Sequence, residues 1–153
     1  MNQCLAIKIS ETGGGDRDES VHFWNELREI FKGTEIYYRQ PQPGKIFAES
    51  LPWIIISRVA DFAGIASAIW VLYEKVKNRT NKNKSIYIDI DSMSGTHWLI
   101  GKSVTDRDAF IQEFVKKLTV LKEDGRLEII FEKTVERVNI DGSWIQKGDD
   151  KQE

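Results

Sequence analysis

Hydrophobic and polar residues alternate along several short segments of this chain and recur every three to four residues along others. CLAIKIS at 4–10 and TEIYYRQ at 34–40 both alternate, so both are predicted to be strands. The second is expected to stop at PQPG, residues 41–44, because proline cannot donate to a ladder. Residues 20–31 instead place apolar side chains on one helical face, and Gly33 follows as a stop signal. These apolar positions are Val21, Trp24, Leu27, Ile30 and Phe31.

The middle of the chain combines a long apolar segment with a predicted hairpin. Residues 51–78 are mostly apolar and are expected to be helical after Pro52. SIYIDID at 85–91 alternates as a strand, and THWLIGK at 96–102 is expected to return as its hairpin partner after the turn SMSG.

Two further elements are expected near the C-terminal end. Thr105 and Asp108 fit a capping box for a helix through residue 121, which Asp124-Gly125 would end. The segment 126–140 partly satisfies both the strand and the helix period. A strand is favoured there by its β-branched residues Ile129, Ile130, Val138 and Ile140.

The element order predicts an α+β fold. The expected order is β-α-β-α-β-β-α-β, which indicates a mixed sheet of about five strands with three helices packed on it. One domain is expected over residues 1–145, followed by a disordered polar tail at 146–153.

Composition and charge narrow the classes of partner. The chain has 153 residues, enough for one domain with its own core, and a formal net charge of −2 at pH 7. No basic field favours nucleic acid, so no nucleic-acid partner is expected. The single cysteine, Cys4, excludes an internal disulfide. The N-terminal residues show no secretory signal pattern, so a cytoplasmic location is expected.

A glycine-lysine-serine sequence at 101–103 raises the question of a phosphate-binding loop. A Walker A motif needs four residues between its glycines, whereas five separate Gly95 from Gly101, and the intervening THWLI is bulky. Consecutive backbone N–H groups converge on a phosphate only where small residues allow it. The sequence therefore favours a hairpin strand, with Trp98 and Ile100 directed to the core.

Asp89 and Asp91 are the strongest candidates for chemistry. They lie two residues apart on a predicted strand and so share one face. Paired carboxylates of this kind hold divalent metal in nucleotidyltransferases, but no phosphate-holding turn precedes them and no third carboxylate is evident. A solvated polar face is the favoured interpretation, with metal-dependent phosphoryl or nucleotidyl transfer as the alternative. His22 and His97 have no cysteine or carboxylate at ligand spacing, so neither zinc nor any cofactor is expected.

Residues 51–73 are long enough to cross a bilayer, which leaves membrane association as a second alternative. Arg58 and Asp61 would each cost roughly 2.5 to 3.5 kcal/mol near the bilayer centre and offset the apolar contribution. A buried core helix is therefore favoured. The basic residues between 75 and 84 would form a solvated helix end or a patch for an anionic partner.

The order of three sequence features resembles the effector-associated constant component family of bacterial conflict systems. These features are the helix FWNELREIF, the strand and break YYRQPQPG, and the apolar helix GIASAIWVLYEKVKNR, followed by a hairpin and a further helix. The resemblance covers roughly residues 3–122 and does not include the segment after residue 125. It implies a non-enzymatic adaptor that couples to an effector encoded nearby, and it supplies no catalytic residues.

A protein-binding adaptor is therefore the function expected from the sequence, with no catalytic residues and no metal. The expected partner is a protein, and the oligomeric state is left open. The residues expected to contact it are Pro41, Pro43, Gly44, Lys45, Arg58 and Asp61.

Overall fold

A computed structural model describes residues 5–12, 17–32, 35–39, 53–56, 61–80, 85–91, 94–141 and 144–146. Six strands and four helices occupy these residues. In chain order they are β1 (Leu5–Thr12), α1 (Arg17–Ile30), β2 (Glu35–Arg39), β3 (Trp53–Ile56), α2 (Phe62–Thr80), β4 (Ser85–Asp91), β5 (Thr96–Ile100), α3 (Arg107–Glu123), α4 (Arg126–Asp141) and β6 (Trp144–Gln146).

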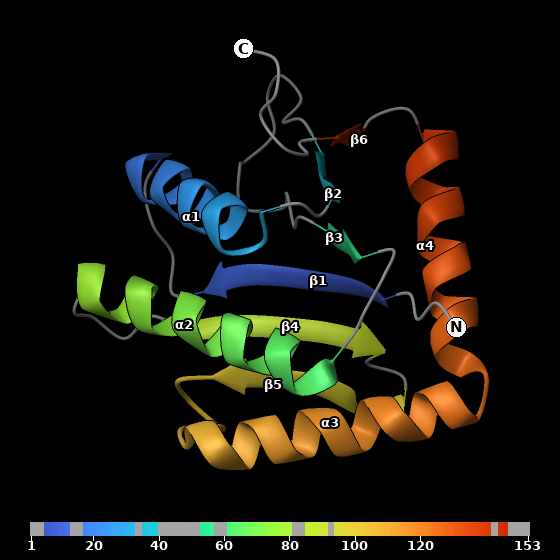
Figure 1. The fold of residues 1–153 in the computed structure, drawn as a ribbon. Helices are drawn as coiled ribbons and strands as arrows, with labels where there is room; N and C mark the ends of the chain where they lie inside the picture. Colours follow the sequence, from blue (N-terminus) through green and yellow to red (C-terminus); the bar gives the residue numbers. More distant parts are fainter. Residues whose placement is uncertain are drawn as a thin grey trace.

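The strands form one sheet in the order β5-β4-β1-β3-β2-β6, and every neighbouring pair is antiparallel. The strands β5, β4 and β1 form one half of this sheet, and side-chain burial is described for most of their residues. Helix α2 lies beside α1 and α3 over one face of the sheet, and α4 runs past one end of the strands from α3 to β6 (Figure 1). The predicted α+β class is confirmed. The predicted mixed sheet of about five strands with three helices is not confirmed: every pairing is antiparallel, β6 is an additional strand, and two segments form the other type of element.

The first of these segments is the start of the apolar stretch 51–78. Residues 53–56 form β3 between β1 and β2, and α2 begins only at Phe62. Trp53 and the three isoleucines after it are β-branched or aromatic and favour an extended strand. Asp61 then begins the helix by accepting a hydrogen bond from the backbone N–H of Ala63 at 3.1 Å. Residues 51–73 therefore do not form one continuous helix. Among the described residues, no helix has both the length and the apolar character needed to cross a membrane.

The second segment is 126–141, which is helix α4 and not a strand. Leu127 and Thr134 are buried, and Ile130 and Phe131 are half-buried between them, which is the spacing of one helical face. The hydroxyl of Thr134 donates to the carbonyl oxygen of Ile130 at 2.9 Å, so this buried polar group is satisfied within the helix. The β-branched residues alone were a misleading signal.

The α3–α4 junction shows why the chain leaves one helix and starts another. Asp124 ends α3 with a backbone N–H bond to Val120, and Gly125 follows with φ of 75°. A residue with a Cβ is strained in this left-handed region, so glycine suits the position. The predicted end of α3 at Asp124-Gly125 is confirmed.

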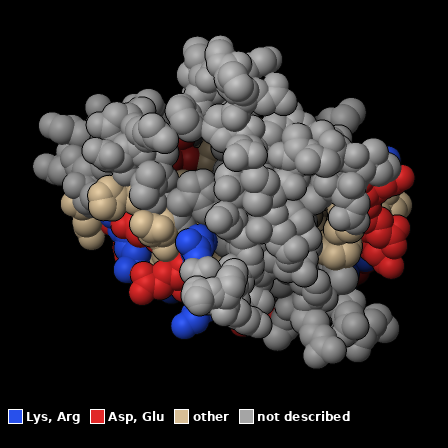
Figure 2. Space-filling model, turned by 90° about the horizontal axis from the view of Figure 1, so that it is seen from above, with Lys and Arg blue, Asp and Glu red and all other residues tan. Residues whose placement is uncertain are grey.

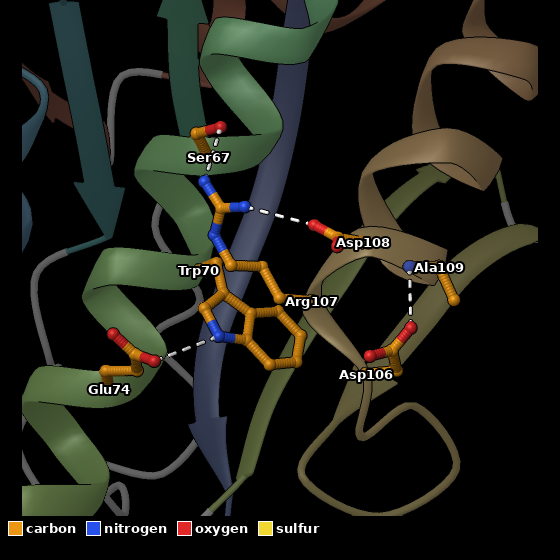
Figure 3. A network of polar contacts seen from close by, with 7 residues as sticks. All are labelled: Ser67, Trp70, Glu74, Asp106, Arg107, Asp108 and Ala109. Carbon is orange, nitrogen blue, oxygen red and sulfur yellow. Dashed lines mark hydrogen bonds and ion pairs between the residues drawn. The ribbon is translucent and has the colours of Figure 1, made fainter.

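The beginning of α3 differs by one residue from the prediction. Asp106, not Thr105, caps the helix: its carboxylate accepts from the backbone N–H of Ala109 at 3.0 Å (Figure 3). A carboxylate at this position also favours the positive end of the helix dipole. The predicted capping box of Thr105 and Asp108 is therefore wrong in register.

The core lies between the sheet and the helices that cover it, and aromatic rings fill its centre. Phe110 of α3 packs against Trp70 of α2 at 5.9 Å and against Trp98 of β5 at 5.6 Å between ring centroids. Both indole N–H groups donate to carboxylates, Trp70 to Glu74 of the same helix at 3.3 Å and Trp98 of β5 to Glu113 of α3 at 2.9 Å. Each indole thus buries its rings without losing a hydrogen bond.

The hairpin predicted at 85–102 is confirmed by the antiparallel pairing of β4 with β5. Gly95 has φ of 81° in the turn, and the Ser94 hydroxyl donates to the carbonyl oxygen of Asp91 at 3.1 Å. Trp98 and Ile100 are buried, as expected from the alternation. The Gly-Lys-Ser sequence at 101–103 therefore follows a core strand and forms a turn.

Candidate functional site

The face of the sheet turned away from the core carries the polar residues of β1, β4 and β5. Ile86, Ile88 and Ile90 of β4 are buried in the core, and the alternate residues Tyr87 and Asp89 are half-buried on the opposite face. We call this surface the polar sheet face. It consists of Lys8, Ser10, Tyr87, Asp89, His97 and Leu99, and Asp91 follows at its border after a bulge in β4.

Strand register aligns these residues in two rows across the sheet. Lys8 lies opposite Asp89, and Asp89 lies opposite His97. Ser10, Tyr87 and Leu99 form the neighbouring row in the same way. Residues directly opposite one another in an antiparallel pair are close enough for their side chains to interact. The result is a mixed row of one cation, one carboxylate and one imidazole beside a row with an aromatic ring.

The Lys8 row continues in backbone register to the far edge of the sheet. Trp53 is paired with Lys8, Tyr37 with Trp53, and Gln146 with Tyr37. Because each pairing is direct, these positions share one line perpendicular to the strands. One residue from each of the six strands therefore occupies a single row.

Tyr87 connects the two described rows. Its ring lies 6.0 Å from the imidazole of His97 between centroids, and the rings are tilted by 53°. Burial raises the pKa of the Tyr87 phenol, and the nearby negative charge of Asp89 raises it further. Tyr87 therefore stays protonated over the physiological range and can both donate and accept a hydrogen bond.

The expectation that Asp89 and Asp91 share one face is not confirmed. A bulge between them shifts the register, so that Asp91 pairs with buried Thr96 while Asp89 pairs with exposed His97. Asp91 accepts a hydrogen bond from Nη2 of Arg126 at 2.9 Å, and its side chain is only 19% exposed. The Oδ1 atom of Asp89 is buried. The pair is therefore not a freely solvated polar face.

This geometry bears on the alternative of a metal-dependent enzyme. A divalent ion at Asp91 would compete with the Arg126 guanidinium for the same carboxylate and would place two cations side by side. Within the described parts of the chain, no group of three His, Cys, Asp or Glu residues is arranged to hold a metal ion. The arrangement suits an ion pair between a strand and a helix better than a two-carboxylate metal site.

The residues expected to contact a partner are largely outside the described residues. Pro41, Pro43, Gly44, Lys45 and Arg58 all lie there. Asp61 is described and exposed, and its carboxylate caps α2 through the backbone N–H of Ala63. The role that the structure gives to Asp61 is therefore in starting the helix.

A second polar cluster joins α2 to α3 on the helix side of the molecule. Arg107 reaches from the first turn of α3 to the hydroxyl of Ser67 on α2 at 3.4 Å and to Asp108 at 3.2 Å (Figure 3). All three residues are at least partly exposed. Ion pairs of this exposure contribute little, so the cluster orients the helix surfaces and is a weak candidate for chemistry.

The outer face of α4 is acidic. Figure 2, which looks onto the molecule from above, shows acidic side chains gathered at the edge where α4 lies. Exposed Glu128, Glu132 and Glu136 recur every four residues along this helix, and exposed Ile129 lies among them. Lys133 is the exposed cation in the same stretch. This stripe is a surface feature separate from the polar sheet face.

Sequence reasoning missed Lys8, Tyr87 and His97 as members of one surface. Their alternation with buried residues does place each of them on the outer face of its own strand. The pattern along one strand does not show that β1 pairs with β4, and it does not show the register of β4 with β5. Only these pairings bring the three residues together.

Comparison with protein-family models, with curated proteins and with solved structures gave no significant match.

Proposed function

We propose that this protein is a non-enzymatic protein-binding adaptor and that the polar sheet face is its recognition surface. The observation that carries the proposal is the row of Lys8, Asp89 and His97, with the Tyr87 ring against His97. The row offers a cation, a carboxylate, an imidazole and a phenol on a backbone held rigid by ladder hydrogen bonds. Tyrosine is enriched where proteins bind each other, because its ring is large and its hydroxyl can pair with polar groups.

The charges on this face favour a protein over a nucleic acid. Lys8 is aligned with Asp89, and Arg126 is paired with Asp91, so each cation has an acidic counterpart. A nucleic-acid surface needs an excess of positive charge that tracks the phosphates. A protein partner with mixed charge and some apolar surface matches a near-neutral face that also carries half-buried Leu99.

The nature of the partner follows from the sequence resemblance alone. That resemblance is to adaptors of bacterial conflict systems, and the corresponding partner is an effector encoded nearby. The proposal of a protein-binding face does not depend on it. An effector is the first partner to test.

The experiment is affinity purification of the chain from its native host after chemical cross-linking, with two matched variants. Tyr87→Ala combined with His97→Ala alters the polar sheet face, whereas Glu132→Ala alters the acidic outer face of α4. We expect one stoichiometric protein with the wild type and with Glu132→Ala, and at least a tenfold lower recovery with the double variant. Circular dichroism melting curves establish that both variants are folded.

Two results would contradict the proposal. Equal recovery with the wild type and the folded double variant would show that the polar sheet face is not the recognition surface. A magnesium- or manganese-dependent thermal shift with nucleotide, abolished by Asp89→Asn, would instead favour the alternative of phosphoryl or nucleotidyl transfer.

A further inference from the structure

Strand β5 forms one edge of the sheet, so one side of its backbone has no neighbour among the described strands. The N–H and C=O groups of one strand residue point to the same side, and every second residue shares that side. The carbonyl oxygen of Leu99 accepts from the backbone N–H of Val104 at 3.2 Å, outside the pairing with β4. Leu99 and His97 therefore direct their backbone groups toward the open edge, and Gly95 lies in the turn directly before β5.

A turn of the chain itself occupies the C-terminal end of this edge. Val104 donates to Leu99, and its own carbonyl oxygen accepts from the N–H of Gly101 at 2.7 Å. Together these bonds make a parallel bridge between Ile100 and Val104. The N–H of Lys102 also approaches the Leu99 carbonyl oxygen at 3.4 Å. The turn 101–104 thus acts as a very short extra strand.

A lysine of α3 occupies the other end of the edge. Nζ of Lys117 donates to the carbonyl oxygen of Gly95 at 3.0 Å. Glu113 lies 3.7 Å from the same ammonium group and also accepts from the indole N–H of Trp98 at 2.9 Å. The Lys117 ammonium lies 5.9 Å from the centre of the Trp98 ring. Lys117 is therefore held over the strand by three separate contacts.

The two contacts cover the carbonyl groups that a second copy of the chain would need. In a two-fold antiparallel pairing of β5 with β5 centred on His97, the His97 N–H and C=O groups would bond to those of the other His97. If the pairing continued beyond β5 into the turn, the next bonds would run from the Leu99 N–H to the Gly95 carbonyl oxygen and from the Gly95 N–H to the Leu99 carbonyl oxygen. Lys117 and Val104 already bind these two carbonyl oxygens.

We infer that Lys117 and the turn 101–104 form a guard that keeps the β5 edge closed to strand addition by a second copy of this chain. Unprotected edge strands are templates for pairing, and a charged side chain or a covering turn prevents it. Among the described residues, the groups of this pairing that the two contacts do not cover are the N–H and C=O groups of His97 and the N–H groups of Leu99 and Gly95. Without the two covered carbonyl oxygens, these four groups cannot complete an antiparallel ladder.

The test removes both contacts at once. Val104→Pro deletes the N–H that binds Leu99, and Lys117→Ala frees the Gly95 carbonyl oxygen. Light scattering on a sizing column is expected to show a concentration-dependent dimer for the double variant. The reference is the wild type at the same concentration, which is expected to show no added association. Adding His97→Pro should abolish the new dimer, because proline removes the central N–H without touching the ladder to β4.

A cysteine trap reports the geometry of the pairing. In a Cys4→Ser background, His97→Cys is expected to form an intermolecular disulfide in the double variant, since hydrogen-bonded residues of an antiparallel pair have Cα atoms about 5.5 Å apart. The same cysteine without the guard substitutions is expected to remain reduced under matched mild oxidation.

A second construction covers the case in which proline at 104 prevents folding. Replacement of the Val104 residue by its α-hydroxy acid removes the same N–H and leaves the side chain in place, and it is combined with Lys117→Ala. A folded guard-free protein that shows no more association than the wild type would overturn the inference. A dimer that persists with His97→Pro would overturn it as well, because that dimer would not use the β5 edge.

Discussion

Arg126 at the start of α4 donates from Nη2 to Oδ2 of Asp91 at the end of β4, at a distance of 2.9 Å. The cation lies in the first turn of a helix, where the dipole disfavours positive charge, so its carboxylate partner compensates for the position. A bulge in β4 lies between Asp89 and Asp91, and Asp91 consequently pairs with Thr96. One ion pair therefore connects the polar sheet face to the helix that leads to β6.

Disrupting this ion pair should destabilise the fold more than disrupting an exposed pair. The Asp91 side chain is 19% exposed, whereas the exposed pair Arg107–Asp108 has 50% and 80% exposed side chains. In a double-mutant cycle with Asp91→Asn and Arg126→Gln, we expect a coupling of about 1 kcal/mol from urea unfolding. The same cycle for Arg107 and Asp108 should give a coupling near zero. Equal couplings for the two pairs would contradict this interpretation.

The cap of α3 can be tested at two adjacent residues. Asp106→Ala should lower the free energy of unfolding by about 1 kcal/mol, because it leaves the Ala109 N–H without its acceptor. Thr105→Ala is the matched control and should change it by no more than about 0.5 kcal/mol. Thermal or urea unfolding distinguishes the two. A larger effect at Thr105 than at Asp106 would contradict the cap at Asp106 and support the capping box expected from the sequence.

The aromatic centre of the core should be sensitive to truncation. Phe110 is fully buried and contacts the rings of Trp70, Trp98 and Phe114. Phe110→Ala should cost about 3 to 5 kcal/mol, and Phe110→Leu should cost less because it leaves a smaller cavity. Val120→Ala on the same helix is the control, since Val120 is 49% exposed and should change stability little. Urea unfolding followed by tryptophan fluorescence measures all three.

The raised pKa of Tyr87 makes a prediction about alkaline pH. The folded protein holds the phenolic proton more tightly than the unfolded chain, whose tyrosines ionise near pH 10. Stability should therefore fall as pH rises above about 10 and should level off above the pKa of the folded state. Tyr87→Phe should weaken this loss, which urea unfolding across that pH range measures.

Isotope-labelled tyrosine NMR separates the two causes of the raised pKa. Asp89→Asn removes the negative charge, so the pKa of Tyr87 should decrease toward its ordinary value without reaching it. Burial is the larger cause and persists in the variant. An unchanged pKa in Asp89→Asn would show that the carboxylate has no influence on the phenol.

Local patterns along the chain were sufficient for much of the secondary structure. The alternation in 85–91 predicted β4, the small residues Ser94 and Gly95 predicted its turn, and the helical spacing around Leu27 predicted α1. These elements depend on interactions between residues close in sequence, which a local pattern records directly. The type of element was mistaken at 53–56, a short apolar run, and at 126–141, where the apolar positions partly satisfy both periods.

The candidate site was only partly predictable. Alternation predicted Asp89 and Asp91 on one face, but a bulge separates them, and the partners of the site come from residues far away in sequence. Lys8 lies 81 positions before Asp89, and Arg126 lies 35 positions after Asp91. The local pattern shows neither pairing, because such contacts join distant segments and form only when the whole sheet has formed.

The sequence by itself determined which faces of the strands and helices are apolar, where the chain turns, and that sheet and helices pack together as an α+β fold. Those properties follow from side-chain hydrophobicity and backbone preferences, which act within a few residues. The tertiary structure alone decided the strand order, the ion pair of Asp91 with Arg126, the row from Lys8 to His97, and the bonds that close the β5 edge. Each of these depends on strand register and on helix placement, which are set by packing of the whole core.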